Sequence, residues 1–173
     1  MLNQKIIFTL DECVEIINYH KEIDNIYDSS KEKRLHVNYL AYNIPNNQKY
    51  GWVFERILNF FIESTSLKID KTPEIIHLHR YQLNSEFIKH HDKNKPERMW
   101  NVGVQLNDQY TGGDLNLFYD ETITVNKDIG TSYIFKPEIY HEVTRVTSGE
   151  RWNLILFLHH NNIVNDLSKK TLF

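Results

Sequence analysis

The sequence predicts a mainly β fold with a jelly-roll-like core and supporting helices on its N-terminal side. After Pro73 the chain consists of short segments rich in β-branched and aromatic residues, separated by turn residues and without a helical pattern between them. Before Pro73, two segments carry apolar residues at helical spacing. Because the strands do not alternate with helices, a sandwich or barrel is favoured over a parallel α/β sheet.

The individual elements follow in order along the chain. A helix is expected over residues 10–22, because Thr9 and Glu12 have the spacing of a capping box at its start. A second helix is expected over 51–65, and the turn-rich residues 43–51 are expected to form a loop. The expected strand segments are 74–83, 86–92, 98–106, 114–125 (with a hairpin turn at Asp120 and Glu121), 131–137, 141–146 and 151–160.

Length and composition restrict the class of protein. The 173 residues fit one domain. Cys13 is the only cysteine, so no intramolecular disulfide can form, which favours a reducing compartment. The N-terminus lacks the apolar run of a signal peptide, and no segment has the roughly 20 apolar residues of a membrane span. We therefore expect a soluble cytoplasmic protein without a membrane partner. The net charge of -3, without a basic block, disfavours nucleic acid as a partner.

The segment EFIKHHD (86–92) contains the most informative motif. In a strand, residues two apart point to the same face, so His90 and Asp92 would lie together while His91 points away. A divalent metal needs further ligands, and His141, at the start of a later strand, is the best candidate. Two histidines and one carboxylate form the donor set of non-haem Fe(II) oxygenases. The alternative is a solvated hairpin end rich in histidine and lysine.

Three longer segments carry a wider pattern. EIIHLHRYQLNSEFIKHHD (74–92) has a tyrosine nine residues before the first histidine of the His-x-Asp motif. RMWNVGVQLNDQYTGGDLNLF (98–118) has an arginine, a strand ending in Leu-Asn and then Gly-Gly-acid-Leu. GTSYIFKPEIYHEVTRVTSGERWNLILFL (130–158) has His-x-Val and an arginine ten residues after that histidine. Together these segments, about half of the chain, resemble the prolyl 4-hydroxylase-like branch of the Fe(II)- and 2-oxoglutarate-dependent dioxygenases.

This resemblance implies a fold and a set of cofactors. It implies one catalytic domain over 1–173, with a helical support region over 1–73 and a double-stranded β-helix core over 74–160. Fe(II) would be the metal, 2-oxoglutarate the cosubstrate and ascorbate a supporting reductant. The iron ligands would be His90, Asp92 and His141.

The resemblance also implies how 2-oxoglutarate binds. Arg151 would pair with its distal carboxylate, a task that suits the planar, permanently charged guanidinium. Family members commonly carry a tyrosine at the position of Gln105, so glutamine is a departure there. The other implied cosubstrate contacts are Tyr81 and Leu115.

Strand alternation extends the expected pocket. If Arg151 points inward, so do the residues two, four and six positions later. The expected substrate pocket therefore contains Asn153, Ile155 and Phe157, together with Asn101, which shares a face with Gln105. His77 and His79 form a weaker candidate metal pair and are expected at a strand edge or pocket rim. Four aromatic residues could line the entrance or belong to the core: Tyr39, Tyr42, Tyr50 and Trp52.

Three functions compete. The first is a hydroxylase acting on a prolyl or other residue in a peptide or protein. The second is a hydroxylase of a free amino acid or another small metabolite, because the short chain leaves little room for a separate peptide-binding domain. The third is a metal-binding β-barrel module without turnover. The intact metal-binding set and Arg151 argue against the third, and succinate production would exclude it.

Overall fold

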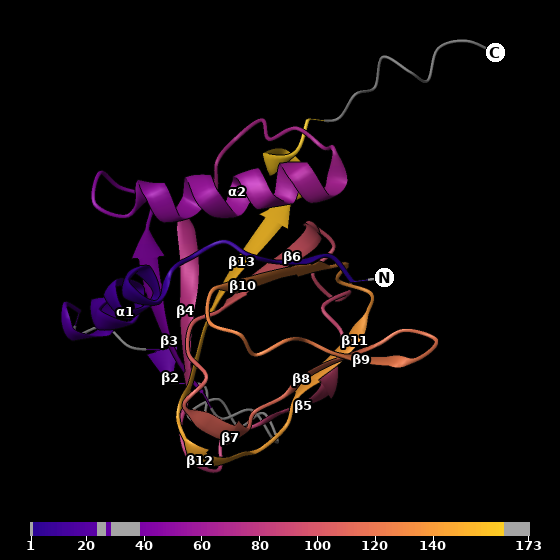
Figure 1. Ribbon diagram of the computed structural model, residues 1–173. Coiled ribbons are helices and arrows are strands. Elements are labelled where there is room, and N and C mark those ends of the chain that lie inside the picture. Colours follow the sequence, from indigo (N-terminus) through magenta and orange to yellow (C-terminus); the bar gives the residue numbers. More distant parts are fainter. Residues whose placement is uncertain (1, 24–26, 29–38, 165–173) are drawn as a thin grey trace.

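Two antiparallel sheets pack against each other in the computed structural model, which describes residues 2–23, 27–28 and 39–164 (Figure 1). The larger, seven-stranded sheet has the order β1 (Gln4–Ile6), β10 (Thr131–Phe135), β6 (Arg98–Gln105), β13 (Arg151–His159), β4 (Ile75–Tyr81), β3 (Leu40–Pro45) and β2 (Tyr27–Asp28). The four-stranded sheet has the order β5 (Phe87–His90), β11 (Tyr140–Val143), β8 (Leu115–Phe118) and β9 (Thr122–Thr124). A two-stranded ribbon of β7 (Tyr110–Gly112) and β12 (Val146–Gly149) closes one end.

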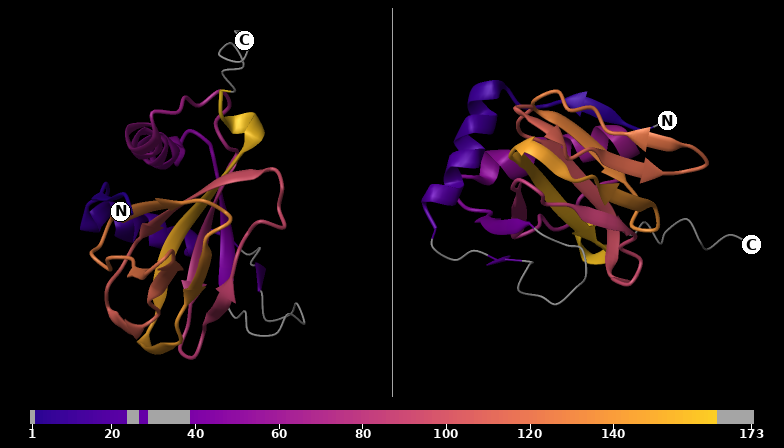
Figure 2. Two further views of the ribbon diagram at one scale, coloured as in Figure 1. Left: turned by 90° about the vertical axis from the view of Figure 1, so that its right-hand side faces the viewer. Right: turned by 90° about the horizontal axis from the view of Figure 1, so that it is seen from below.

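Two α-helices cover the outer face of the larger sheet. In Figure 2, α1 (Leu10–Asn18) and α2 (Gly51–Thr65) lie on the side away from the four-stranded sheet. The Thr9 and Glu12 side chains each bond the other residue's backbone N–H, so the expected capping box is present. Short 3-10 turns follow α1 (Tyr19–Lys21) and β13 (His160–Asn162). Within the described residues, no helix is long and apolar enough to cross a membrane.

The two faces of the larger sheet have different surroundings. On β13, Trp152, Leu154 and Leu156 pack into the core beneath the helices. The alternate residues Arg151, Asn153 and Ile155 face a cavity between the two sheets. This alternation agrees with the inward and outward faces expected from the sequence. The mainly β fold with N-terminal helices, expected as a double-stranded β-helix core, is thus the fold observed.

Two boundaries differ from the sequence prediction. The first helix ends at Asn18 instead of residue 22, since Tyr19 turns into the core and its hydroxyl donates to the carbonyl of Asn43 (2.8 Å). Residues 43–45, expected in a loop, belong to strand β3. Among the described residues, β2 pairs with Leu40 and Ala41 and not with Pro45, so the N–H that proline lacks has no partner in β2 to lose.

The segment 114–125 forms two strands around the hairpin turn expected from the sequence. β8 and β9 pair as a hairpin, and the expected turn lies at Asp120 and Glu121. The Tyr119 N–H donates to the Glu121 carbonyl across this turn (3.1 Å).

Candidate metal centre

Three side chains of metal-ligating types converge on one wall of the space between the sheets. His90 ends β5 and lies directly opposite His141 of β11 in the register of the two strands. Asp92 lies beyond the end of β5, and not in the strand as expected; its N–H donates to the carbonyl of Pro137 (2.8 Å). Nε2 of each histidine lies 4.0 Å from an oxygen of Asp92, and one ligand atom from each residue lies within 4.8 Å of the others. These three residues could hold one metal ion.

Backbone hydrogen bonds orient both imidazoles toward Asp92. Nδ1 of His90 lies 2.8 Å from the carbonyl oxygen of Ile88, and Nδ1 of His141 lies 2.9 Å from that of Ile139. A carbonyl oxygen only accepts, so each Nδ1 carries the hydrogen and each Nε2 presents its lone pair. Metal-binding histidines are typically held in this way.

Burial keeps these imidazoles uncharged. It lowers the pKa of His90, against the opposing effect of the Ile88 carbonyl. Burial, followed by the proximity of His90, lowers the pKa of His141 to about 4. A metal ion binds the neutral imidazole, so at neutral pH neither histidine has to lose a proton first.

Hydrogen bonds from neighbouring side chains hold only one of the two carboxylate oxygens of Asp92. Nη1 of Arg98 lies 2.7 Å from Oδ2, and Nδ2 of Asn101 donates to the same oxygen at 2.8 Å. The Arg98 guanidinium also stacks on the ring of Phe157, 3.4 Å from its centroid. Among the described residues, every hydrogen bond to this carboxylate reaches Oδ2, which leaves Oδ1 for a metal.

A buried cation lies on the larger sheet. Arg151 is 2% exposed and starts β13, where Nη1 donates to Oδ1 of Asn153 and Nε has no hydrogen-bond partner. Within residues 2–23, 27–28 and 39–164, Arg151 forms no ion pair with a carboxylate. A buried charge without a counter-ion is costly, so this guanidinium is suited to bind an anion.

One cavity of about 420 Å³ connects the His-Asp-His set with Arg151. Tyr81 and Leu115, expected as cosubstrate contacts, line it. The expected substrate-pocket residues also line it, namely Asn101, Asn153, Ile155 and Phe157. Of these, Asn101 and Phe157 contact the Asp92–Arg98 pair, and Asn153 contacts Arg151.

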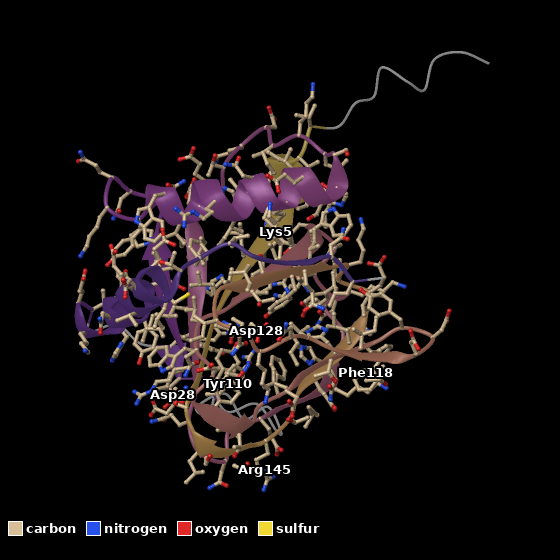
Figure 3. All side chains as sticks on the ribbon, in the orientation of Figure 1. Lys5, Asp28, Tyr110, Phe118, Asp128 and Arg145 are labelled. Atoms are coloured by element: carbon tan, nitrogen blue, oxygen red, sulfur yellow. The ribbon has the colours of Figure 1, made fainter. Side chains whose placement is uncertain are left out.

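Gln105 differs from the expectation for a cosubstrate contact. Its side chain is 3% exposed and is not part of the cavity lining. Nε2 donates to the carbonyl of Asn107 (2.8 Å) and to the hydroxyl of Tyr110. Figure 3 shows Tyr110 at the end of the molecule that β7 and β12 close. Gln105 therefore bonds to Tyr110 and lies outside the cavity lining.

Sequence reasoning missed Tyr133. This residue of β10 is 1% exposed, lines the cavity and lies within hydrogen-bonding reach of Arg151. Its cross-strand partner is Gly103. A glycine inside an apolar strand often marks a place where a neighbouring group approaches closely, and that was the available signal.

The other expected residues divide between pocket and core. His79 lines the cavity, in agreement with the pocket-rim alternative, while β4 is an inner strand of the larger sheet and so excludes the strand-edge alternative. His77 bonds the side chain of Asn43 (2.8 Å). Of the four aromatic candidates, Tyr39 lines the cavity, whereas Tyr42 and Tyr50 are buried in the core beneath the helices and Trp52 packs against it.

Comparison with protein families supports the resemblance read from the sequence. Residues 76–159, from β4 to the end of β13, match the model of the 2OG-Fe(II) oxygenase superfamily. The segment contains all three candidate metal ligands and Arg151. The resemblance to this superfamily is therefore confirmed. No curated protein is significantly similar to the chain in sequence.

Solved structures show the same fold. A prolyl-4-hydroxylase from Pseudomonas putida aligns with a TM-score of 0.71 at 16% identity, covering 91% of each chain. A 2OG-Fe(II) family oxidoreductase from Burkholderia pseudomallei aligns with 0.73 at 16% identity, covering 93% of this chain and 85% of its own. A prolyl hydroxylase from Trichoplax adhaerens, in complex with a hypoxia inducible factor peptide, aligns with 0.74 at 13% identity, covering 91% and 83%. At these sequence identities the similarity shows a shared fold and nothing beyond it.

Proposed function

We propose that the protein is an Fe(II)- and 2-oxoglutarate-dependent dioxygenase that hydroxylates an unactivated C–H bond in a residue of a peptide or protein, with proline as the first candidate. One observation carries the proposal. A single cavity has a two-histidine, one-carboxylate set on one wall and a buried, unpaired arginine on another. That combination suits a metal together with a dicarboxylate that bridges from it to the guanidinium.

Each group has a defined task in this proposal. His90, Asp92 and His141 would hold Fe(II) and leave neighbouring coordination positions for ligands. Arg151 would bind the distal carboxylate of 2-oxoglutarate and so orient its 2-oxo acid end toward the metal. When bound, iron and 2-oxoglutarate supply the oxidation, in which O₂ is consumed, the 2-oxo acid becomes succinate and CO₂, and the substrate gains a hydroxyl group. The apolar wall residue Leu115 would exclude water from the cosubstrate.

The aromatic lining of the cavity favours an apolar ring in the substrate. The rings of Tyr39 and Phe87 stack with centroids 5.9 Å apart, and His79 packs against Tyr39 at 4.4 Å. Such an aromatic wall suits an apolar ring such as that of proline. Two of the similar structures are prolyl hydroxylases, and one of them holds a peptide, which adds support for a peptide substrate.

Succinate formation tests the proposal. Iron-loaded protein is incubated with 2-oxoglutarate and O₂, and succinate is measured with proline-containing peptides and with free proline. Stimulation by the peptides supports the proposal. Stimulation by the free amino acid alone would favour a small-metabolite hydroxylase. Absence of succinate under every condition would contradict an enzyme and favour a metal-binding module.

A further inference from the structure

We propose that Tyr133, and not Gln105, supplies the hydroxyl group that binds the distal carboxylate of 2-oxoglutarate beside Arg151. The inference rests on the proposed function and deepens it by naming a binding residue. It is carried by the juxtaposition of Tyr133 and Gly103 in adjacent strands.

The Tyr133 ring occupies the place of a side chain at position 103. The two residues are direct partners in the antiparallel pair of β10 and β6. A Cβ atom on Gly103 would lie 2.2 Å from Cζ and 2.3 Å from the hydroxyl oxygen of Tyr133. Real non-bonded carbon atoms keep about 3.5–4.0 Å apart, so any other residue at position 103 would displace this hydroxyl. The glycine thus allows Tyr133 to lie flat across the sheet toward Arg151.

Gln105, the residue expected to contact the cosubstrate, forms its hydrogen bonds outside the cavity lining. The Gln105 amide donates to the Asn107 carbonyl and the Tyr110 hydroxyl, both away from the cavity lining. Tyr133 lines the cavity in the same sheet and within reach of the same guanidinium. A tyrosine hydroxyl therefore reaches the guanidinium from β10, and not from the position of Gln105 on β6.

The chemistry of the two groups is complementary to a carboxylate. Burial raises the pKa of Tyr133 against the lowering effect of Arg151, so the phenol stays protonated at neutral pH. Its oxygen can accept from the guanidinium while its hydrogen is donated to an anion. A carboxylate between them would receive charge-assisted bonds from Arg151 and one further bond from Tyr133.

Removal of single hydroxyl groups tests this assignment. Tyr133→Phe is compared with Tyr110→Phe, a matched control that deletes the same atom from another tyrosine within hydrogen-bonding reach of Arg151, but outside the cavity lining. The dissociation constant of 2-oxoglutarate is measured anaerobically on the Fe(II) protein from the visible charge-transfer band. Thermal unfolding by circular dichroism establishes that each variant is folded.

Tyr133→Phe is expected to weaken 2-oxoglutarate binding about tenfold or more, the usual effect of losing a hydrogen bond to a charged group. Tyr110→Phe should stay within about threefold of wild type. Gly103→Ala keeps the Tyr133 hydroxyl but displaces it, so it should also weaken binding, and it decides the matter if Tyr133→Phe does not fold.

The assignment of Tyr133 and the proposed function can be overturned separately. If wild type binds 2-oxoglutarate and Tyr133→Phe and Gly103→Ala bind it equally well, the assignment of Tyr133 is overturned while the proposed function stands. If wild type itself does not bind 2-oxoglutarate, both are overturned.

Discussion

Nδ2 of Asn101 lies 2.8 Å from Oδ2 of Asp92, so a residue expected in the substrate pocket holds a candidate metal ligand in place. Groups that orient a ligand usually contribute 10- to 100-fold to metal affinity, roughly. Asn101→Ala should therefore weaken Mn(II) or Fe(II) binding about tenfold in anaerobic calorimetry.

Asn153→Ala is the matched control for Asn101. It removes the same amide from the same sheet face, but its partner is Arg151 and not Asp92. Its metal affinity should stay near that of wild type. Equal losses in the two variants would indicate a general disturbance of the sheet.

Substitutions of the adjacent histidines His90 and His91 should have different effects on metal binding. His90→Ala should abolish metal binding, because Nε2 of His90 is one of the three converging ligand atoms. His91 instead packs edge-on against Tyr140, with ring centroids 4.9 Å apart, so His91→Ala should leave metal affinity nearly unchanged. Equal loss in both variants would contradict the assigned ligand set.

Arg151 should matter for anion binding and little for folding. Arg151→Met removes a buried charge that has no carboxylate partner among the described residues, but it also leaves Oδ1 of Asn153 without its donor, so the free energy of unfolding should fall by no more than about 1–3 kcal/mol. The affinity for 2-oxoglutarate should fall at least about 100-fold, since the counter-charge is lost. A large loss of stability would show that Arg151 serves the fold.

Acid should destabilise the protein through His77. Burial, and then Arg98, lower the pKa of His77 to about 4, whereas an unfolded histidine titrates at about 6.5. Between these values the unfolded chain binds more protons. The free energy of unfolding therefore falls as the pH falls, by at most about 1.4 kcal/mol per pH unit for this residue.

His77→Gln, which can still hydrogen-bond to Asn43, isolates this effect. Urea unfolding at several pH values between about 6.5 and 4 should give a shallower pH dependence for the variant than for wild type. Identical slopes would show that His77 charges freely in the folded protein.

Much of the architecture could be predicted because it depends on local patterns. The period of two in the strand that starts at Arg151 fixes which side chains share a face, and the capping box at Thr9 fixes the start of α1. The His-x-Asp motif is also local. These signals require no knowledge of which strands are neighbours.

The missed features depend on pairing between distant segments. The contact of Tyr133 with Gly103 requires the register of β10 against β6, and spacing alone does not give it. The orientation of Gln105 toward Tyr110 likewise follows from how β7 closes the end of the molecule. Strand β3 escaped prediction because its asparagine and proline are typical of turns.

The formation of a complex between Fe(II), 2-oxoglutarate and the protein tests the central claim most directly. The metal-free protein is titrated anaerobically with Fe(II) and then with 2-oxoglutarate, while the visible charge-transfer band of the chelate is recorded. We expect the band in wild type and a strongly weakened response in Arg151→Met. A folded, iron-loaded wild-type protein that gives no band would contradict the proposed cosubstrate and leave a metal-binding module without turnover.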